Sequence, residues 1–580
     1  MTPRVNRPQV LVYVAVVLAV SGCGEEPAWF PGGAAAGSTS SRDLQGAGAA
    51  LWGASVEPLG DGLVAVAVTD EDELQIVDLN TSQVRRHIRF PTGSKPTRFA
   101  VTKDGAFAVV LRGSGQLAVV QPGGDWRRYE ACGEPRGVTF DEARGLVRAA
   151  CADGKLVTVG PEGARAVEVG EELRDVFAFD GRVWATAFRT AELLELDDEG
   201  QVVGRLTPCR QTVTLPDGRG QSRTLTFTPR AALRAVLQGT RVVMVHQQHL
   251  DDEVSALTVR PDAPPTPPPY YGLGPRCGDA VVGSAVTAFD LKKGAVEWTA
   301  LVSGAVPLDV AVDDTSLSLV MTGSGGVSRT LWAGVRAGVC LSAVPQVVTP
   351  TPVGVGLVEG TPVVVDANGT LVTPGRPVVA LRSRPTSDAA RDFFHRQSPS
   401  GVACASCHVE GDDDGHTWDF GGRRVRTQVL SGGLSRTAPF HWRGELSSLQ
   451  SVLRLTFEQR MGGTLAPGFS THDLEAWLDS LPSRRGRTAD VSAGEATFQS
   501  AGCAGCHSGP RFTSNGTVDV GTGGAFQVPS LRGLKARGPW MHNGCAEKLE
   551  QRFDPACGGS KHGTVSPAEV PDLVKYLESL

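Results

Sequence analysis

The region from residue 51 to residue 383 consists of short apolar runs separated by turns rich in Gly, Asp and Asn. Apolar and polar positions often alternate within the runs, and hardly any segment shows the period of an amphipathic helix. A period of two is typical of strands that bury one face of a sheet, and the turn residues favour chain reversal. This region is predicted to be all β.

The predicted strands come in repeating units. Pro96-Thr-Arg-Phe-Ala-Val, Pro135-Arg-Gly-Val-Thr-Phe and Leu173-Arg-Asp-Val-Phe-Ala-Phe recur at about 39 residues. Degenerate copies begin at three later positions, Leu233, Val306 and Pro352. With the opening unit, 60–90, the count is about seven, and a period near 40 with about four strands per unit is typical of β-propeller blades. The region resembles YVTN-like and WD40-like propellers, although no Trp-Asp signature is kept; two stacked β-sandwiches are the alternative.

A long insertion, 246–279, interrupts this region and contains the Pro-rich run from Pro261 to Tyr271. Proline lacks the backbone donor that a central strand needs, so the insertion is predicted to be an extended loop on one propeller face. Such loops are often interaction surfaces, and a solvated linker is equally compatible with the sequence. His246 and His249 lie at its start without suitable neighbours for a metal site, so we assign them no role.

Beyond about residue 384, helical segments alternate with Gly-rich loops. The predicted helices are 388–396 after a Ser387 cap, 471–481, 493–499 after a Ser492 cap, and 566–580. Two small helical domains are therefore predicted, with boundaries 384–490 and 491–580.

Each of these domains carries a Cys-x-x-Cys-His motif, Cys404 to His408 in the first and Cys503 to His507 in the second. In this motif the two thiols, here Cys404 with Cys407 and Cys503 with Cys506, add to the vinyl groups of a haem, and the adjacent imidazole binds the iron. Two c-type haems are therefore predicted, with His408 and His507 as proximal ligands, and the two helical domains resemble class I type cytochrome c domains. The alternative is a redox or zinc Cys-x-x-Cys followed by a chance histidine, and zinc would need two further ligands at each motif.

The two domains align at an offset of 100 residues. The matched pairs are Gly433-Leu434 with Gly533-Leu534, Pro439-Phe440 with Pro539-Trp540, Gly444 with Gly544, and Leu449 with Leu549. Tandem copies of one plan are expected to pack about a pseudo-twofold axis with both haems near a shared interface. Trp442 and Trp540 are predicted to flank that interface, either as electron relays or as core aromatics.

Three segments of these domains carry a more specific family resemblance. The segments 528–533 and 538–544 resemble the "TPSLRN … APYFHDG" region of the bacterial dihaem cytochrome c peroxidases and their MauG relatives, and 437–444 resembles the corresponding segment of the first domain. The resemblance covers about residues 385 to 580. It implies a dihaem oxidoreductase. A calcium ion between the domains is a further family feature, but no acidic cluster in this sequence indicates where it would bind.

The sixth iron ligands decide the function, because a peroxidase needs an exchangeable position and an electron-transfer haem does not. Where the family places Met or Tyr, this chain has His562, so bis-His ligation by His507 and His562 is predicted; a surface His562 with another ligand such as Met541 is the alternative. His416 resembles the family's removable distal histidine of the first haem, although its spacing is shorter and it could face solvent instead.

Peroxide cleavage also requires a general base. The resemblance points to Glu458 as the catalytic carboxylate, with an exposed helix-face residue as the alternative reading. The family's distal Gln has no counterpart, since Val452 falls at its place. Two functions therefore stay open: a peroxidase or MauG-like oxidase, or a non-enzymatic electron-transfer and binding protein with both irons six-coordinate.

The amino terminus resembles a bacterial lipoprotein signal. Arg4 and Arg7 precede the apolar run 10–20, which ends at Cys23. This predicts a signal peptide at 1–22, lipid attachment at Cys23, a flexible tether at 23–50 and a periplasm-facing location, with Gly24 indicating the outer membrane. An ordinary secretory signal is the alternative.

The remaining composition limits the partners. A net charge of −6 without a basic block gives no reason to expect nucleic acid, so a redox protein such as a small cytochrome or cupredoxin is expected instead. The propeller's own ligand cannot be identified from the sequence. An oxidising compartment permits disulfides, and Cys132 with Cys151 and Cys545 with Cys557 are the preferred pairs.

Overall fold

The computed structural model describes residues 53–216, 222–254, 271–272, 274, 276–342, 344–383, 387–482 and 490–580. The predicted signal peptide and tether, the lipidation residue Cys23 and the run 261–269 lie outside the described residues. Within the described ranges, none of the helices has the length and apolar character needed to cross a bilayer.

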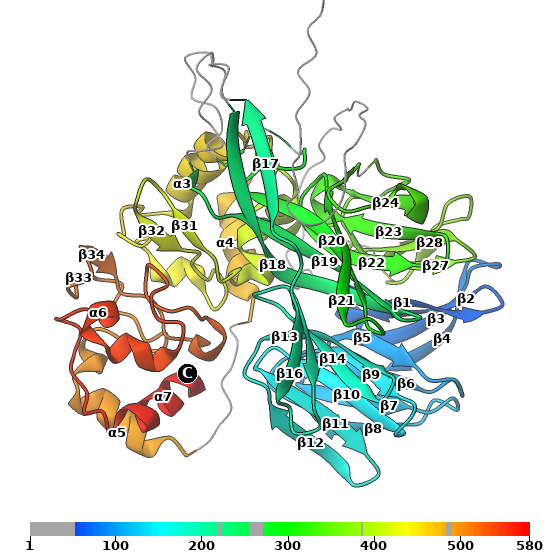
Figure 1. Ribbon diagram of the computed structural model, residues 1–580, viewed down its shortest axis with the longest axis horizontal. Helices are drawn as coiled ribbons and strands as arrows, with labels where there is room; N and C mark the ends of the chain where they lie inside the picture. Colours follow the sequence, from blue (N-terminus) through cyan, green and yellow to red (C-terminus); the bar gives the residue numbers. More distant parts are fainter. Residues whose placement is uncertain are drawn as a thin grey trace, which may run out of the picture.

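Seven sheets form the amino-terminal region and are the blades of a propeller (Figure 1); neighbouring strands are antiparallel except for the parallel pair β21 and β25 in the fifth. Their strands, blade by blade, are β1 (Val56–Gly60), β2 (Leu63–Val68), β3 (Glu73–Asp78) and β4 (Gln83–Arg89); β5 (Pro96–Val101), β6 (Phe107–Leu111), β7 (Gln116–Val120) and β8 (Trp126–Glu130); β9 (Pro135–Asp141), β10 (Leu146–Cys151), β11 (Lys155–Gly160) and β12 (Gly163–Glu168); β13 (Leu173–Phe179), β14 (Arg182–Ala187), β15 (Glu192–Leu196) and β16 (Val202–Leu206); β17 (Gln211–Pro216), β18 (Ser222–Gln238), β19 (Arg241–Leu250), β20 (Val282–Asp290), β21 (Ala295–Val302) and β25 (Cys340–Leu341); β22 (Pro307–Val312), β23 (Ser316–Met321), β24 (Gly326–Leu331) and β26 (Val347–Val348); β27 (Pro352–Val358), β28 (Thr361–Asp366), β29 (Thr370–Val372) and β30 (Val379–Ala380). The predicted propeller with about seven four-stranded blades is confirmed, and the two-sandwich alternative does not describe it.

The ring of blades closes through its innermost strands. Each blade's inner strand contacts that of the next, in the order β5, β9, β13, β18, β22, β27 and β1. The segment before β1 completes the ring, since the Ala54 amide donates to the Val353 carbonyl at 2.9 Å and the Ser55 amide donates to the Thr97 carbonyl at 3.2 Å. Apolar clusters fill the spaces between neighbouring blades. Sheet-on-sheet burial of this kind, rather than a single central core, stabilises the region.

The fifth blade differs from the others because it has six strands. Its strands β18 and β19 are long, and β19 continues to Leu250, so the insertion predicted to begin at His246 begins after that strand. His246 and His249 are buried strand residues. A disulfide between Cys277 and Cys340, which was not predicted, ties the returning end of the insertion to β25.

The carboxyl-terminal third forms a group of short helices and loops beside the blades (Figure 1). Its elements are α1 (Ala389–His395), α2 (Cys404–Cys407), η5 (Val409–Gly411), β31 (Thr417–Asp419), β32 (Arg424–Arg426), η6 (Leu434–Thr437), α3 (Leu449–Val452), the π-helix η7 (Leu453–Arg460), α4 (Thr471–Ser480), α5 (Ser492–Ser500), η8 (Cys503–Gly505), β33 (Thr517–Asp519), β34 (Ala525–Gln527), η9 (Leu534–Ala536), η10 (Leu549–Phe553), α6 (Pro555–Gly558) and α7 (Val570–Ser579); three 3-10 turns, η1 (Thr69–Glu71), η3 (Thr322–Ser324) and η4 (Trp332–Gly334), belong to the propeller. We call residues 387–482 the first half and residues 490–580 the second half.

Both predicted helix caps are displaced by one position. Asp388, rather than Ser387, caps α1 by accepting hydrogen bonds from the amides of Ala390 and Arg391. Ser492 is the first residue of α5, and Val491 precedes it without a side-chain cap. The first amides of a helix have no partner within the helix, and the Asp388 carboxylate accepts hydrogen bonds from two of them. Asp388 is therefore the cap, and the neighbouring serine is not.

The cores of the two halves are built differently. The first half buries Phe393, Phe394 and Trp477 in one apolar cluster with Ala305 and Val306 of the propeller. In the second half, α5 and α7 pack together in a cluster that draws its described members from that half alone. The first half is therefore continuous with the propeller core, whereas the second half has its own.

Candidate functional site

The two Cys-x-x-Cys-His motifs adopt the same kind of backbone turn. The amide of His408 donates to the carbonyl of Cys404 at 3.0 Å, and the amide of His507 donates to that of Cys503 at 2.9 Å. A helical turn brings residues three and four apart onto one side, so two thiols and one imidazole can face a common group. The duplication seen in the sequence is thus a duplication of local structure.

The motif cysteines differ from six others in the described chain. Disulfides join Cys132 with Cys151, Cys277 with Cys340 and Cys545 with Cys557, which confirms both preferred pairs. The motif thiols are all unpaired, namely Cys404, Cys407, Cys503 and Cys506. Burial raises the pKa of Cys404 to about 12, so the thiol is protonated and is not a reactive thiolate. A redox Cys-x-x-Cys would favour the opposite shift.

One large cavity, of about 610 Å³, runs between the two motifs and is lined by residues of both halves. All four motif cysteines and both motif histidines reach it. Its wall is mainly apolar, as is common for cofactor sites. The structure therefore places both motifs on one shared space, in keeping with the interface predicted from the repeat.

Reciprocal hydrogen bonds join the halves across this space. The amide of Arg426 donates to the carbonyl of His542 at 2.8 Å, and the amide of Gln527 donates to the carbonyl of Trp442, also at 2.8 Å. These four residues are equivalent in pairs in the two copies, so the contacts support the predicted pseudo-twofold arrangement.

The two predicted interface tryptophans have different surroundings. Trp442 lies at the interface, with its ring 6.3 Å from that of His542. Trp540 instead belongs to the core of the second half, and its indole donates to the Leu534 carbonyl at 3.0 Å. His542, which stacks on Phe526 at 3.9 Å, takes the place opposite Trp442.

At the second motif, two imidazole rings lie close together. The rings of His507 and His562 have centroids 6.4 Å apart and an interplanar angle of 33°. His507 Nδ1 lies 3.0 Å from the Phe512 carbonyl, and His562 Nδ1 lies 3.1 Å from the Gly558 carbonyl. If each Nδ1–H donates to its carbonyl, each Nε2 keeps a lone pair for a metal. Burial lowers the pKa of His562 to about 4, which keeps that ring neutral.

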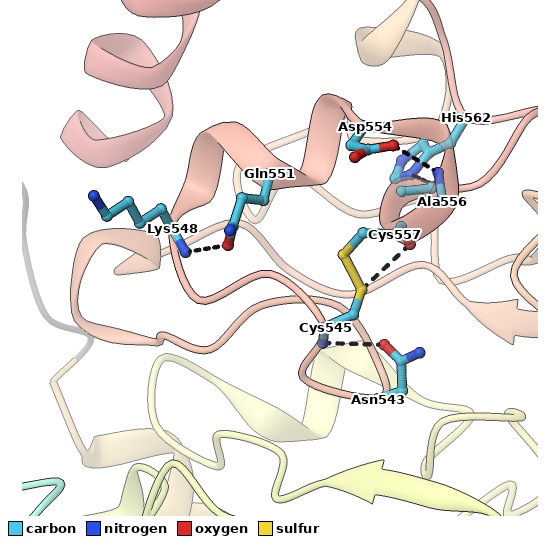
Figure 2. Close-up of a disulfide and its surroundings, with 9 residues drawn as sticks. Asn543, Cys545, Lys548, Gln551, Asp554, Ala556, Cys557 and His562 are labelled. Carbon is cyan, nitrogen blue, oxygen red and sulfur yellow. Dashed lines mark hydrogen bonds between the residues drawn. A yellow bond between two sulfur atoms is a disulfide. The ribbon is translucent and has the colours of Figure 1, made fainter.

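A disulfide holds the segment that carries His562. Figure 2 shows the Cys545–Cys557 bond beside this residue, next to the turn of α6. The Asp554 carboxylate caps that turn by accepting from the Ala556 amide at 2.9 Å. Arg552 donates to the His562 carbonyl. The second imidazole is thus fixed from several directions, as a metal ligand requires.

The surroundings of the first motif are different. Burial is the main cause that lowers the pKa of His408 to about 4, and nearby His441 lowers it further. His441 and Glu445 both line the cavity, and His441 Nδ1 lies 3.1 Å from Glu445 Oε1. Burial lowers the pKa of His441, so its ring is neutral near pH 7. A carboxylate at Nδ1 leaves Nε2 available to accept a proton.

The two residues predicted from the resemblance for catalysis do not line this cavity. His416 is buried against the propeller, where its Nε2 lies 3.2 Å from the Leu250 carbonyl and its ring packs on His249 and Trp418. Burial lowers its pKa to about 3. Glu458 is half-buried on η7, whose residues Thr456, Phe457 and Arg460 reach the cavity while Glu458 does not. The roles of both residues stay predictions that this geometry does not support.

Sequence reasoning missed Glu410 and the pair formed by His441 and Glu445. The pair had a detectable signal, because His441 lies in the repeated Pro-aromatic segment and a carboxylate follows it four residues later. Glu410 follows His408 by two residues and is buried among propeller arginines, a contact that local sequence does not predict.

The residues around the cavity fit haem. The motif thiols are unpaired, the imidazoles are neutral, and the walls are apolar. Basic side chains that could pair with haem carboxylates also line it, namely Arg423, Arg426, Arg443, Arg460, Arg537, Arg552 and Lys561. Among the described residues, the one group of three metal-ligating side chains is Cys132, Cys151 and Asp153, whose sulfurs share a disulfide. It supports neither the zinc alternative nor a location for the predicted calcium.

Comparison with known proteins identifies a relative of this chain. No family model matches the chain. The methylamine utilization protein MauG of Methylorubrum extorquens is 36% identical over 266 residues, an alignment that covers 32% of this chain and 75% of that protein.

Two solved structures show weaker likeness. Hydrazine synthase of Kuenenia stuttgartiensis is 14% identical, covering 59% of this chain and 100% of that chain with a TM-score of 0.41. A streptogramin B lyase is 12% identical, covering 56% of this chain and 93% of that chain with a TM-score of 0.33. Similarities of this size do not by themselves establish a shared fold or activity. On the match to MauG, the chain belongs to the MauG family of dihaem cytochrome c peroxidase-like oxidoreductases, with a seven-bladed propeller before the family region.

Proposed function

We propose that the protein is a dihaem oxidoreductase in which His408 and His507 each bind the iron of one covalently attached haem, with peroxide reacting at the first haem and electrons arriving through the second. The observation that carries this proposal is that the two motifs have different neighbours on one cavity: a second imidazole 6.4 Å away at the second motif, and a histidine–carboxylate pair at the first. When bound, haem would supply iron that changes its oxidation state and, with one position open, binds peroxide.

At the second motif, His507 and His562 would both bind the iron of the second haem. The separation between His507 and His562 is 6.4 Å. A centre closed by two protein ligands transfers electrons without binding substrate, and imidazole in place of thioether lowers its potential.

At the first motif, the residues of the chain would manage a proton. Neutral His441 can accept the peroxide proton at Nε2, and Glu445 at Nδ1 would orient the ring and stabilise its charged form. Glu445 is the one carboxylate among the described residues that line the cavity. This assigns to the pair the task that the sequence resemblance gave to Glu458.

A pH profile of peroxide turnover tests this assignment in the full-length protein. His441→Gln is expected to lower kcat/KM by 10²–10⁴-fold, the usual contribution of a general base. Glu445→Gln is expected to lower it less and to move the acidic limb of the profile. Glu458→Gln serves as the comparison, and a large loss in that variant with none in His441→Gln would overturn the assignment.

A second function is favoured by one observation. Met461 is 3% exposed, lines the cavity and falls beside the position that matches His562 in the repeat. If its thioether bound the first iron, both centres would be six-coordinate and the protein would only transfer electrons. Met461→Ala distinguishes the two: it would open the first iron in the electron-transfer protein and leave its spin state unchanged in the peroxidase.

We further propose that lipid attachment at Cys23 holds the protein on the periplasmic side of the envelope, at the outer membrane. The propeller would bind a partner there, and a small cytochrome or cupredoxin would be the electron donor. The signal-like segment 1–22 and the extracytoplasmic chemistry of haem attachment support this location. In cell fractionation, Cys23→Ala should move the protein from the membrane to the soluble fraction. Retention in the membrane would contradict the anchor.

A further inference from the structure

The turn that follows the first motif enters the arginine-lined mouth of the propeller. Glu410 lies in η5, two residues after His408, and its side chain is 7% exposed. Arg112 Nη2 donates to Glu410 Oε2 at 2.7 Å, and Arg174 Nη1 donates to Glu410 Oε1, also at 2.7 Å. Arg136 Nη1 donates to Oε2 as well. The three arginines come from the second, third and fourth blades, so one carboxylate ties the motif to three blades at once.

This contact is linked directly to the proximal histidine. The Gly411 amide donates to the His408 carbonyl at 3.0 Å, which closes the turn around Glu410. Only a small space, about 30 Å³, is left between this turn, Ala405 of the motif and the surrounding arginines. Movement of the Glu410 side chain would therefore displace the backbone that carries His408.

The backbone of Glu410 gives a second, independent observation. Its φ of 58° lies in the left-handed region, which residues other than glycine rarely adopt. The equivalent residue in the second half is Gly509, also left-handed with a φ of 69°. Glycine is the residue that suits this turn, so the first half keeps a disfavoured residue at a position from which its carboxylate reaches the three arginines.

We propose that Glu410 is a positioning residue for His408: its carboxylate, held by Arg112, Arg136 and Arg174, lets the propeller fix the proximal side of the first haem. The inference rests on the proposed function only in taking His408 as the ligand of the first iron. The second haem has no such link at Gly509, so it serves as an internal reference in the same molecule.

The test uses the full-length protein with both haems and two substitutions. Glu410→Gln and Glu410→Gly both remove the negative charge, but glutamine can still accept hydrogen bonds from the arginines while glycine cannot. Loss of a nearby negative charge disfavours oxidised iron, so both variants should raise the midpoint potential of the first haem. In Glu410→Gly the change in its reduced-to-oxidised ratio should be about tenfold or more, equivalent to about 59 mV for one electron.

Electron paramagnetic resonance separates positioning from charge. The signal of the first haem should broaden in Glu410→Gly more than in Glu410→Gln, because only glycine releases the turn, and the signal of the second haem should stay unchanged in both. Glu297→Gln, which removes an exposed carboxylate paired with Arg241 on the fifth blade, should alter neither haem. Equal changes in both Glu410 variants would reduce the effect to charge and overturn the proposal, as would a folded Glu410→Gly protein with an unaltered first haem.

If Glu410→Gly does not fold, Arg112→Lys replaces it. This variant keeps the positive charge and loses the two-pronged contact, so a smaller broadening at the first haem is expected, and no change would contradict the proposal. Peroxide turnover of the wild-type protein is measured separately. Its absence would refute the proposed function and leave the positioning test intact.

Discussion

The two halves of the haem-binding region share a backbone plan and differ in what holds them. Both contain a Cys-x-x-Cys-His turn, a small hairpin and a Pro-aromatic segment, and they exchange matched hydrogen bonds. The first half shares its core with the propeller and inserts Glu410 into it. The second half packs on its own helices and is held by the Cys545–Cys557 disulfide. Duplication thus set the common geometry, and the residues around each copy separated their tasks.

The histidine environments differ in the same way. The second half has two neutral imidazoles whose rings lie 6.4 Å apart, which suits a closed electron-transfer centre. The first half has a histidine paired with a carboxylate on the cavity wall, which suits proton transfer beside an open iron. Function in this duplicated region therefore follows from the residues that surround each motif and not from the motif itself.

Removing one pair of motif thiols is expected to have the largest effect. Cys404→Ala with Cys407→Ala should lower the covalent haem content from two to one per chain and abolish the peroxide reaction. Cys503→Ala with Cys506→Ala should also leave one haem and should retain peroxide binding without sustained turnover. Denatured-haem absorbance and intact mass give the haem count. Two covalent haems in either double variant would contradict the assignment of the motifs.

Opening the second iron is expected to change its spin state completely. His562→Ala removes the imidazole that faces His507, so the second haem should convert from low-spin to high-spin while the first keeps its spectrum. Met541→Ala is the matched control because Met541 also lines the cavity and is the alternative ligand. A low-spin second haem in His562→Ala together with a high-spin one in Met541→Ala would reverse the ligand assignment.

A pH-dependent effect is expected at the contact between the first half and the propeller. Asp414 is fully buried, its carboxylate lies 3.8 Å from His249 Nδ1, and burial raises its pKa from 3.8 to about 7. Between pH 3.8 and about pH 7, Asp414 is protonated in the folded protein and ionised in the unfolded chain. The free energy of unfolding therefore falls as the pH rises. The decrease is roughly 1.4 kcal/mol per pH unit and is complete above about pH 7.

Asp414→Asn removes this decrease because asparagine does not titrate. Its advantage in melting temperature over the wild type should be absent near pH 4 and largest above pH 7. Asp519→Asn in the second half is the control: a backbone bond from Gly521 lowers the pKa of that exposed carboxylate, so any effect should be small and opposite in sign. A melting-temperature difference independent of pH would contradict a protonated Asp414.

Removing the Cys545–Cys557 disulfide is expected to have a smaller effect on the second half. Cys545→Ser with Cys557→Ser opens a short loop, and the second half should lose about 2–3 kcal/mol of stability. Thermal unfolding followed at the low-spin absorbance of the second haem measures this loss. Cys132→Ser with Cys151→Ser is the matched control, because it should destabilise the propeller and leave that absorbance unchanged at low temperature. If both double variants changed the second haem equally, the Cys545–Cys557 disulfide would have no specific role in holding the His562 segment.

The sequence predicted those features that depend on neighbours in the chain. Blade repeats follow from strand periodicity, and each Cys-x-x-Cys-His motif is complete within one helical turn. The two predicted disulfides join cysteines 19 and 12 residues apart, whereas the pair that was missed is 63 apart. Helix ends were displaced by one residue because Asp388 and Ser387 are both good caps, and only the folded backbone distinguishes them.

Features that depend on tertiary contacts could not be predicted. Glu410 and Arg112 are 298 residues apart, and nothing in either segment indicates the other. His416 was assigned from a resembling segment, but β19 of the propeller covers that part of the first half and its Leu250 carbonyl engages the ring. A propeller packed on the first half changes the surroundings of residues that a family pattern alone would place at the iron.

Electron paramagnetic resonance of the oxidised full-length protein, before and after addition of hydrogen peroxide, tests the inequality of the two haems most directly. We predict one high-spin and one low-spin ferric signal of equal intensity, with peroxide consuming the high-spin signal while His507 and His562 keep the other haem low-spin. Two low-spin signals that peroxide leaves unchanged would contradict the account.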